Sequence, residues 1–167
     1  MLLEIVLIFI FIIINGFFAA SEIAVVSMRR SRIKQLIEEG NINAKVLNKL
    51  REEPDRFLAT IQIVVTLAGA IASAIGGAAA GEIIKPALNI IPVPFISLAS
   101  EAISIGIVVV IISYIALVFG ELVPKSIALA NPETVSLLTA PAINRFARFT
   151  AIFVKLLTST TNIILKP

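Results

Sequence analysis

ISIGIVVVIISYIALV occupies residues 103–118, and FGELVPK follows it at residues 119–125. The apolar run is part of a segment, 102–123, that is long enough to cross a bilayer, for which about 20 residues suffice. Glu121 falls at or just inside the edge of the hydrocarbon, and Pro124 has no N–H to bond the carbonyl of Gly120. The stretch therefore predicts a membrane span whose helix breaks at Pro124 and leaves a free backbone oxygen beside a carboxylate.

The composition is that of an integral membrane protein. Of the 167 residues, 58% are hydrophobic and 15% are charged, and the mean hydropathy is +1.02. That is too apolar for a soluble domain of this length. Cysteine and histidine are both absent, which excludes disulfides, thiolate chemistry and the usual zinc or copper ligands, so that only oxygen donors remain for a metal. We find no nucleophile–base pair, phosphate loop or acid pair with catalytic spacing, so we expect neither an enzyme nor a nucleic-acid partner.

The pattern predicts a single all-α transmembrane domain over residues 1–167. Two further spans are expected at about 2–27 and 57–80. The polar segment 28–56 between them has helical periodicity, is divided at Gly40-Asn41 and ends at Pro54, so it is interpreted as a cytosolic helical hairpin.

The C-terminal part, 132–165, is predicted as one juxtamembrane helix. Asn131-Pro132-Glu133 is a typical helix start. The apolar residues beyond Pro141 recur at helical spacing, and basic residues occupy another face. Two interpretations stay open: a fourth span with Lys155 buried, at a cost of roughly 3 kcal/mol, or a basic amphipathic helix at the inner interface, which the basic stripe favours.

Lysine and arginine predict the orientation of a multi-pass cell-membrane protein. Residues 28–56 hold eight basic residues, whereas the 81–101 connection holds only Lys85 and none precedes the first span. The positive-inside rule therefore places the N-terminus and the 81–101 loop outside, and the hairpin and the C-terminus in the cytosol. The end at Lys166-Pro167 is typical of a membrane domain cut from a longer protein, although a natural end stays open.

Polar and small residues follow one helix face in each span. The faces comprise Asn15, Ala19 and Glu22 with Ser21 beside them; Gln62, Thr66, Gly69 and Ser73; and Gly106, Ser113 and Gly120 with Tyr114 and Glu121 on the adjacent stripe. We expect the three stripes to turn toward a common axis. The alternative is that these small residues only let the helices pack closely.

A hard cation could bind between these stripes. Its expected ligands are the Glu121 carboxylate, the Gly120 carbonyl and the side-chain oxygens of Asn15, Ser21 and Ser73, with Gly69 and Glu22 as further candidates. Mg²⁺ prefers about six oxygens in octahedral geometry, and Na⁺ fits the same ligands with less demanding geometry.

Two alternatives to this cation site involve ion pairs. Glu121 could form a structural pair with Lys125 at spacing i, i+4. Glu22 could lie near the inner headgroups, paired with Arg29 or Arg30.

Three motifs resemble the transmembrane domain of the CorC/cyclin-M (CNNM) family, which is implicated in magnesium transport. They are NGFFAASE at 15–22; FLATIQ at 57–62, leading to TLAG at 66–69 and ASA at 72–74; and GELVPK at 120–125. The resemblance implies three spans with a juxtamembrane helix, a homodimer, and a cytosol-facing cation pocket in each subunit that exports Mg²⁺ in exchange for Na⁺.

The resemblance carries the family's acid onto Glu121 and its polar first-span position onto Asn15 or Ser21. Some members have asparagines in the second span where this chain has Val65 and Gly69, so those ligands cannot be carried over. The cytosolic nucleotide-binding (CBS) pair that normally follows is not in this sequence.

Two functions are therefore expected. The first is Mg²⁺ export coupled to Na⁺, because moving two positive charges outward against 100 mV costs about 4.6 kcal/mol. The alternative is a Mg²⁺-sensing membrane anchor that regulates cytosolic domains of the same full-length chain without transport. A membrane-lytic pore fits poorly with short stiff connections and specific buried polar groups.

Overall fold

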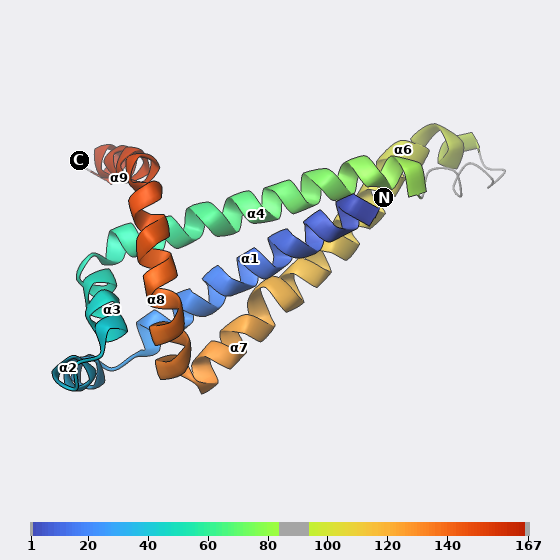
Figure 1. Cartoon of the computed structure of the whole chain (residues 1–167). Coiled ribbons are helices and arrows are strands. Elements are labelled where there is room, and N and C mark those ends of the chain that lie inside the picture. The colour runs from blue at the N-terminus through green and yellow to red at the C-terminus, as the bar shows by residue number, and fades with distance from the viewer. Residues whose placement is uncertain (1, 84–93, 166–167) are drawn as a thin grey trace.

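The computed structural model describes residues 2–83 and 94–165, and within these ranges the chain forms helices and short connections without a strand. Three long shafts lie side by side (Figure 1). They are α1 (Leu2–Ser27), α4 (Pro54–Ile83) and a third shaft built from α6 (Pro94–Leu117), η1 (Val118–Leu122) and α7 (Val123–Ala130). Each contains a stretch long and apolar enough to cross a membrane: Leu2–Ser27, Pro54–Ala79 and Ala102–Ala130. The expectation of three apolar spans in an all-α chain is confirmed.

The second span begins earlier than the apolar pattern alone indicates. Pro54 ends the preceding helix, as predicted, but it also starts α4, because a proline in the first turn lacks only an N–H that the helix does not use. The N–H of Phe57 already bonds the carbonyl of Glu53 at 3.0 Å. The predicted 81–101 connection is shorter than expected, since α4 reaches Ile83 and α6 begins at Pro94; residues 84–93 lie outside the described residues.

The prediction that the helix breaks at Pro124 is wrong. The helical backbone continues to Ala130, and Leu122 and Val123 keep right-handed helical angles (φ −66°, ψ −50° and φ −63°, ψ −49°). The proline is accommodated by a π-helical turn, in which the N–H of Val123 bonds the carbonyl of Val118 instead of that of Phe119. The wider turn shifts the hydrogen-bond register just where the proline removes a donor.

Residues 28–56 contain two short helices at one end of the shafts (Figure 1). These are α2 (Arg30–Glu38) and α3 (Ile42–Glu52). Gly40 between them has a φ of +87°, which favours glycine. The Asn41 side chain caps α3 by accepting a hydrogen bond from the N–H of Ala44 at 3.1 Å.

The predicted helix over 132–165 is two helices, α8 (Pro132–Phe149) and α9 (Ala151–Leu165). They separate at Thr150, whose hydroxyl donates to the Phe146 carbonyl at 3.0 Å, while Pro141 is tolerated inside α8. α8 lies across the ends of the shafts (Figure 1). The 15 residues of α9 span only about 22 Å, shorter than the roughly 30 Å hydrocarbon core.

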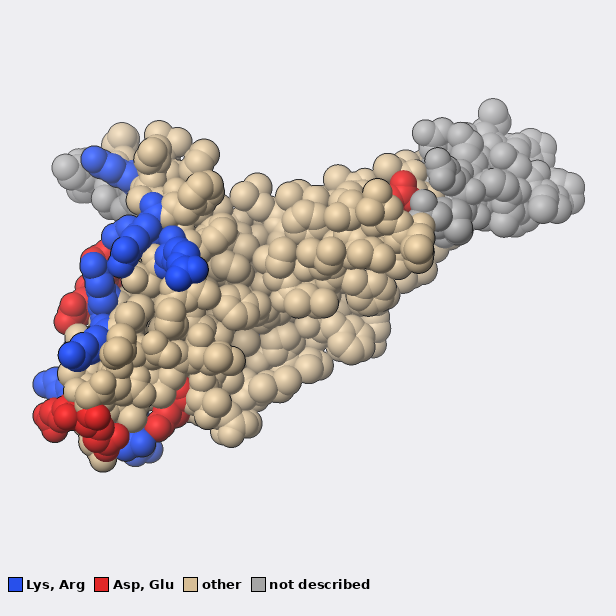
Figure 2. Space-filling model, viewed as in Figure 1, with Lys and Arg blue, Asp and Glu red and all other residues tan. Residues whose placement is uncertain are grey.

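A hydrophobic core forms where α1, α3, α4 and α8 meet. Its members include Leu47, Ile61 and Ile143, all essentially fully buried, and the rings of Phe18 and Phe146 pack edge to face at 5.3 Å. Charged side chains gather at this end of the molecule, whereas the shafts carry few charged side chains on the face shown (Figure 2). The core therefore fixes the polar end against the span that carries Asn15.

Candidate metal-binding site

The centre of the candidate site is a close contact between α1 and η1. A Cβ on Gly16 would lie 2.9 Å from Pro124 Cγ and 3.2 Å from the Phe119 carbonyl oxygen. A Cβ on Gly120 would lie 3.1 Å from Asn15 Nδ2. Because each element turns a glycine toward the other, the α1 backbone and the π turn approach more closely than larger side chains allow.

Asn15 is the polar group at this contact. The residue is 8% exposed, and its Oδ1 has no hydrogen-bond partner within the described ranges. A buried acceptor without a donor costs about 1–3 kcal/mol, and carbonyl-type oxygens are ligands that hard cations prefer. The structure thus brings Asn15 and Gly120 together, as the sequence predicts, and leaves one oxygen there in need of a partner.

Ser21 and Glu22 lie one to two turns further along α1. Ser21 is fully buried, and its hydroxyl donates to the Phe17 carbonyl at 2.6 Å, which leaves the oxygen lone pairs free to accept. Glu22 is half-buried. In the part of the chain that the structure describes, it forms no ion pair with Arg29 or Arg30.

Glu121 is paired with Lys125, as the alternative interpretation of the sequence anticipated. Lys125 Nζ lies 2.6 Å from Glu121 Oε1, and the two side chains are 28% and 39% exposed. A pair this exposed contributes roughly 0–1 kcal/mol. The carboxylate is therefore held by a partly exposed ammonium rather than enclosed beside Asn15.

The expectation that all three polar stripes face a common axis is wrong for α4. Gln62 and Thr66 are exposed and bond each other at 3.3 Å. Gly69 would meet nothing within 4 Å if it carried a Cβ, and Ser73 is half-buried. The buried face of α4 instead comprises Phe57, Thr60, Ile61, Val64, Ala68 and Ala72. Gly69 is therefore not brought to the α1–η1 contact, and no hydrogen bond of Ser73 links it there among the described residues.

The part of the third stripe that lies in α6 also faces away from the other helices. Gly106, Ser113 and Tyr114 of α6 are exposed, and only Gly120 on this stripe is buried. Asn15 of the first stripe and Gly120 of the third stripe contact each other. Burial of a whole helix face depends on which neighbour it meets, not on the periodicity alone.

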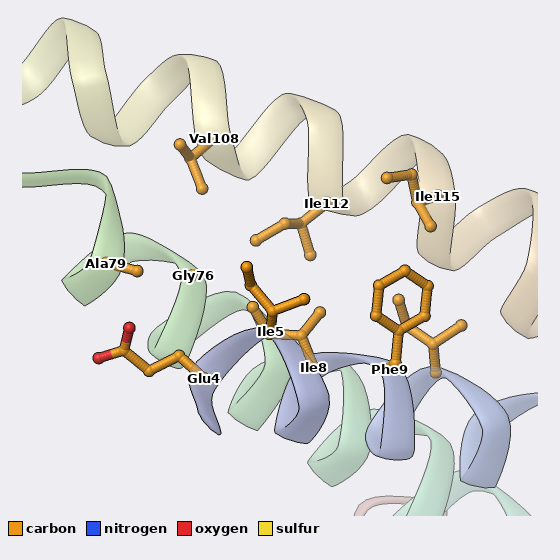
Figure 3. Close-up of a pocket in the computed structure, with 10 residues that line it drawn as sticks. Glu4, Ile5, Ile8, Phe9, Gly76, Ala79, Val108, Ile112 and Ile115 are labelled. Carbon is orange, nitrogen blue, oxygen red and sulfur yellow. The ribbon is translucent and has the colours of Figure 1, made fainter. Parts of the chain in front are cut away.

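Two apolar cavities lie between the helices. One of about 180 Å³ lies between α1, α4 and α6. Figure 3 shows Ile5, Ile8 and Phe9 of α1 pointing there toward Ile112 of α6. The other, of about 280 Å³, lies between α1, α4, α8 and α9. Neither is lined by Asn15 or Glu121, so the expected cation pocket is not one of these two cavities.

The donor set fits a site with one carboxylate and several neutral oxygens. Among residues 2–83 and 94–165, no three His, Cys, Asp or Glu side chains gather as metal ligands. Sequence reasoning missed the part played by Gly16 and the Phe119 carbonyl. The dipeptide Asn15-Gly16 inside an apolar helix was the available signal, because a glycine there permits a close helix approach.

Comparison with known proteins supports the family seen in the motifs. The family described as the cyclin M transmembrane N-terminal domain matches residues 6–167. The UPF0053 protein sll0260 of Synechocystis is 40% identical over 98% of this chain, and the UPF0053 protein YhdP of Bacillus subtilis is 32% identical over 99%. The UPF0053 inner membrane protein YfjD of Escherichia coli is 30% identical over 74%. The chain spans 36% and 37% of the length of the first two. It therefore belongs to the cyclin M (CNNM) transmembrane family.

Proposed function

We propose that this domain exports Mg²⁺ across the cell membrane in exchange for Na⁺ and catalyses no chemical reaction. The family membership and the three apolar shafts support a role in cation transport. The charged end formed by α2, α3 and α8 supports an orientation with that end and the C-terminus in the cytosol and the N-terminus outside. The inner-membrane name of the E. coli relative fits the same location.

The observation that carries the proposal is the buried Asn15 Oδ1 at the α1–η1 contact. A cation placed there would satisfy this oxygen, and the π turn brings further oxygens to the same region. Pro124 has no N–H, so either the Phe119 or the Gly120 carbonyl loses its helical donor. With Ser21 Oγ and the Glu121 carboxylate, these oxygens make a ligand set suited to a hard cation.

Lys125 would compete with the cation for the Glu121 carboxylate. Its ammonium occupies one oxygen of Glu121 in the structure. A divalent ion carries twice the charge of the ammonium and interacts with the same carboxylate, so it competes with a pair that is itself weak. We propose that Mg²⁺ binding releases Lys125 from Glu121.

The outward stripe of α4 supports a homodimer. Gln62 and Thr66 expose polar atoms on a helix that otherwise meets hydrocarbon. Interhelical hydrogen bonds between polar side chains, and close approach at small residues such as Gly69, associate helices in membranes. A second copy of this chain packed on that stripe would cover these groups.

Flux through reconstituted protein tests the proposed transport. Liposomes containing the full chain and a Mg²⁺-sensitive dye should show Mg²⁺ movement that depends on an imposed Na⁺ gradient. Glu121→Gln should abolish the movement because it removes the only carboxylate of the ligand set. The matched control Glu52→Gln changes the same chemical group on α3 and should keep the flux. Wild-type flux in Glu121→Gln would contradict the site.

The second candidate function is a Mg²⁺ sensor that passes occupancy to cytosolic domains of the full-length chain. It is favoured by the bidentate ion pair between Arg32 of α2 and Glu133 of α8, whose two N···O distances are both 2.8 Å, because this pair links the segment between the first two spans to the helix that follows the third span. Mg²⁺ binding that requires Glu121, without flux under any Na⁺ gradient, would establish the sensor and exclude the exporter.

A further inference from the structure

A polar cavity of about 520 Å³ lies between α2 and α3, away from the α1–η1 contact. One face of α2 lines it at spacing i, i+3, i+4 and i+7, and one face of α3 closes it. The principal lining residues are Arg30, Ile33, Lys34 and Ile37 of α2 with Asn48 and Arg51 of α3. Ile33 is 1% exposed and forms an apolar floor, so the cationic side chains surround a built recess rather than a flat surface.

The cavity is cationic. Three basic side chains line it against one acid, Glu52, and the carboxylate of Glu52 already accepts a hydrogen bond from Asn48 Nδ2 at 2.7 Å. Neither Arg30 nor Lys34 has a carboxylate partner within the described residues, whereas Arg32 on another face of α2 bonds both Glu133 and Glu39. The positive charges of the cavity thus remain available to an anion.

The positively charged side chain of Arg51 lines this cavity. The side chain donates a hydrogen bond to the Met28 carbonyl, which fixes its position. Burial, and then the nearby positive charge of Arg30, lower the pKa of Arg51 from its ordinary value, although arginine stays protonated. Two like charges held side by side repel each other, and a bound anion would relieve that repulsion.

The N-terminal turn of α2 adds to the positive electrostatic potential of the cavity. Arg29 precedes the helix without a side-chain capping bond, and the first turn carries no acidic residue. The first backbone N–H groups of a helix favour negative charge. Arg30 at the start of this turn also lies three residues after α1 ends at Ser27, which places the cavity beside the edge of the membrane.

We propose that the α2–α3 cavity binds a phosphate group, carried either by an anionic lipid headgroup or by a soluble phosphate. Arginine and lysine around a recess are the side chains that recognise phosphate oxygens, the guanidinium through paired hydrogen bonds and the ammonium as a point charge. The position at the end of a span matches the depth of lipid phosphates. This site is separate from the proposed Mg²⁺ site and does not depend on it.

The test uses the full chain in nanodiscs of phosphatidylcholine, titrated with inorganic phosphate by calorimetry. A double variant, Arg30→Gln with Lys34→Gln, removes two exposed charges of the cavity and should preserve the fold. The matched control, Lys45→Gln with Lys49→Gln, removes two exposed charges of α3 outside the cavity. At about fivefold per lost charge, phosphate should bind roughly 30-fold more weakly to the first variant than to the wild type. The control should bind it as the wild type does.

A second arm identifies the source of the phosphate. Nanodiscs that also contain phosphatidylglycerol should suppress the phosphate titration if a lipid headgroup fills the cavity. Native mass spectrometry should then find phosphatidylglycerol retained by the wild type and the control but not by the cavity variant. An unchanged titration identifies soluble phosphate as the ligand. Absence of both saturable phosphate binding and selective lipid retention, or equal losses in the two double variants, would overturn the proposal.

Discussion

Helices α1 and α4 carry similar polar stripes, yet α1 turns its stripe inward and α4 turns its stripe outward. Asn15, Ala19 and Ser21 are buried in contact regions of α1, whereas Gln62 and Thr66 of α4 are exposed. α1 packs against α4, η1, α7 and α8, and most of its polar stripe lies within these contacts. α4 packs against α1 and α6 among others, but Gln62 and Thr66 lie outside its contacts.

α4 buries the face that meets the hydrophobic core. Phe57, Ile61 and Val64 on this face belong to the core, whereas Gln62 and Thr66 on the polar stripe are exposed. The inward stripe is therefore suited to binding an ion, and the outward stripe to binding another helix. The predictions below separate these two roles.

The largest effect is expected at the glycine contact of the inward stripe. Gly120→Leu should destabilise the protein by about 1–3 kcal/mol, because a Cβ at this position already approaches Asn15 Nδ2 to 3.1 Å and the Ile12 carbonyl oxygen to 3.4 Å. The thermal midpoint in detergent should fall by about 2–4 °C per kcal/mol. Gly106→Ala, which would meet nothing within 4 Å, is the control and should not lower it. Equal midpoints for both variants would contradict the close contact.

The outward stripe should control association and not Mg²⁺ binding. Gln62→Leu with Thr66→Val removes the polar groups, and the dimer should weaken by roughly 1–2 kcal/mol, about 5- to 30-fold in its dissociation constant. Energy transfer between labelled copies in liposomes measures this constant. Asn15→Leu should leave it unchanged. If the α4 variant dimerises normally and Asn15→Leu does not, the assignment of the two stripes is reversed.

Lys125 should compete modestly with the cation. In Lys125→Met the Glu121 carboxylate loses its ammonium partner, so Mg²⁺ should bind up to about fivefold more tightly, in line with a pair worth at most roughly 1 kcal/mol. Calorimetry in the same detergent measures the change, and Lys45→Met is the control. Weaker Mg²⁺ binding in Lys125→Met would show that the lysine supports the site instead.

The smallest effect is expected at the ion pair between Arg32 and Glu133. The hydrogen bond from Arg32 lowers the pKa of Glu133 from its ordinary 4.5. The ion pair therefore stabilises the fold fully at a pH above the ordinary pKa of the carboxyl group. This stabilisation is lost as the pH falls through the lower pKa that Glu133 has in the folded protein. Thermal midpoints of the wild type and Glu133→Gln should differ slightly at neutral pH and converge in acid. Parallel curves at all pH values would contradict this linkage.

Much of the fold could be predicted from apolar length and helix punctuation. The three apolar spans and the helix start at Pro132 follow from patterns within one segment. The continuation of the helix past Pro124 could not be predicted, because a shift to a π register leaves no mark on side-chain periodicity. The link from Arg32 to Glu133 joins residues 101 positions apart and depends on how α8 crosses the shafts.

The sequence alone could not predict whether the polar stripe of α4 is buried or exposed. Periodicity assigns Gln62, Thr66, Gly69 and Ser73 to one helix face, and all four lie in the continuous helix α4. Which face is buried depends on competition between that stripe and the apolar residues opposite, a balance set by the neighbouring helices. The ligands expected from α4 are consequently not brought to Asn15.

A Mg²⁺ titration by calorimetry of the wild type, Asn15→Leu and Glu121→Gln tests the cation site most directly. The two variants change groups on α1 and η1, the two elements that meet at the proposed site. We predict saturable binding to the wild type and a loss of more than about tenfold in affinity for each variant, with the folded dimer retained. Wild-type affinity in both variants would contradict a cation site at the contact between α1 and the π turn.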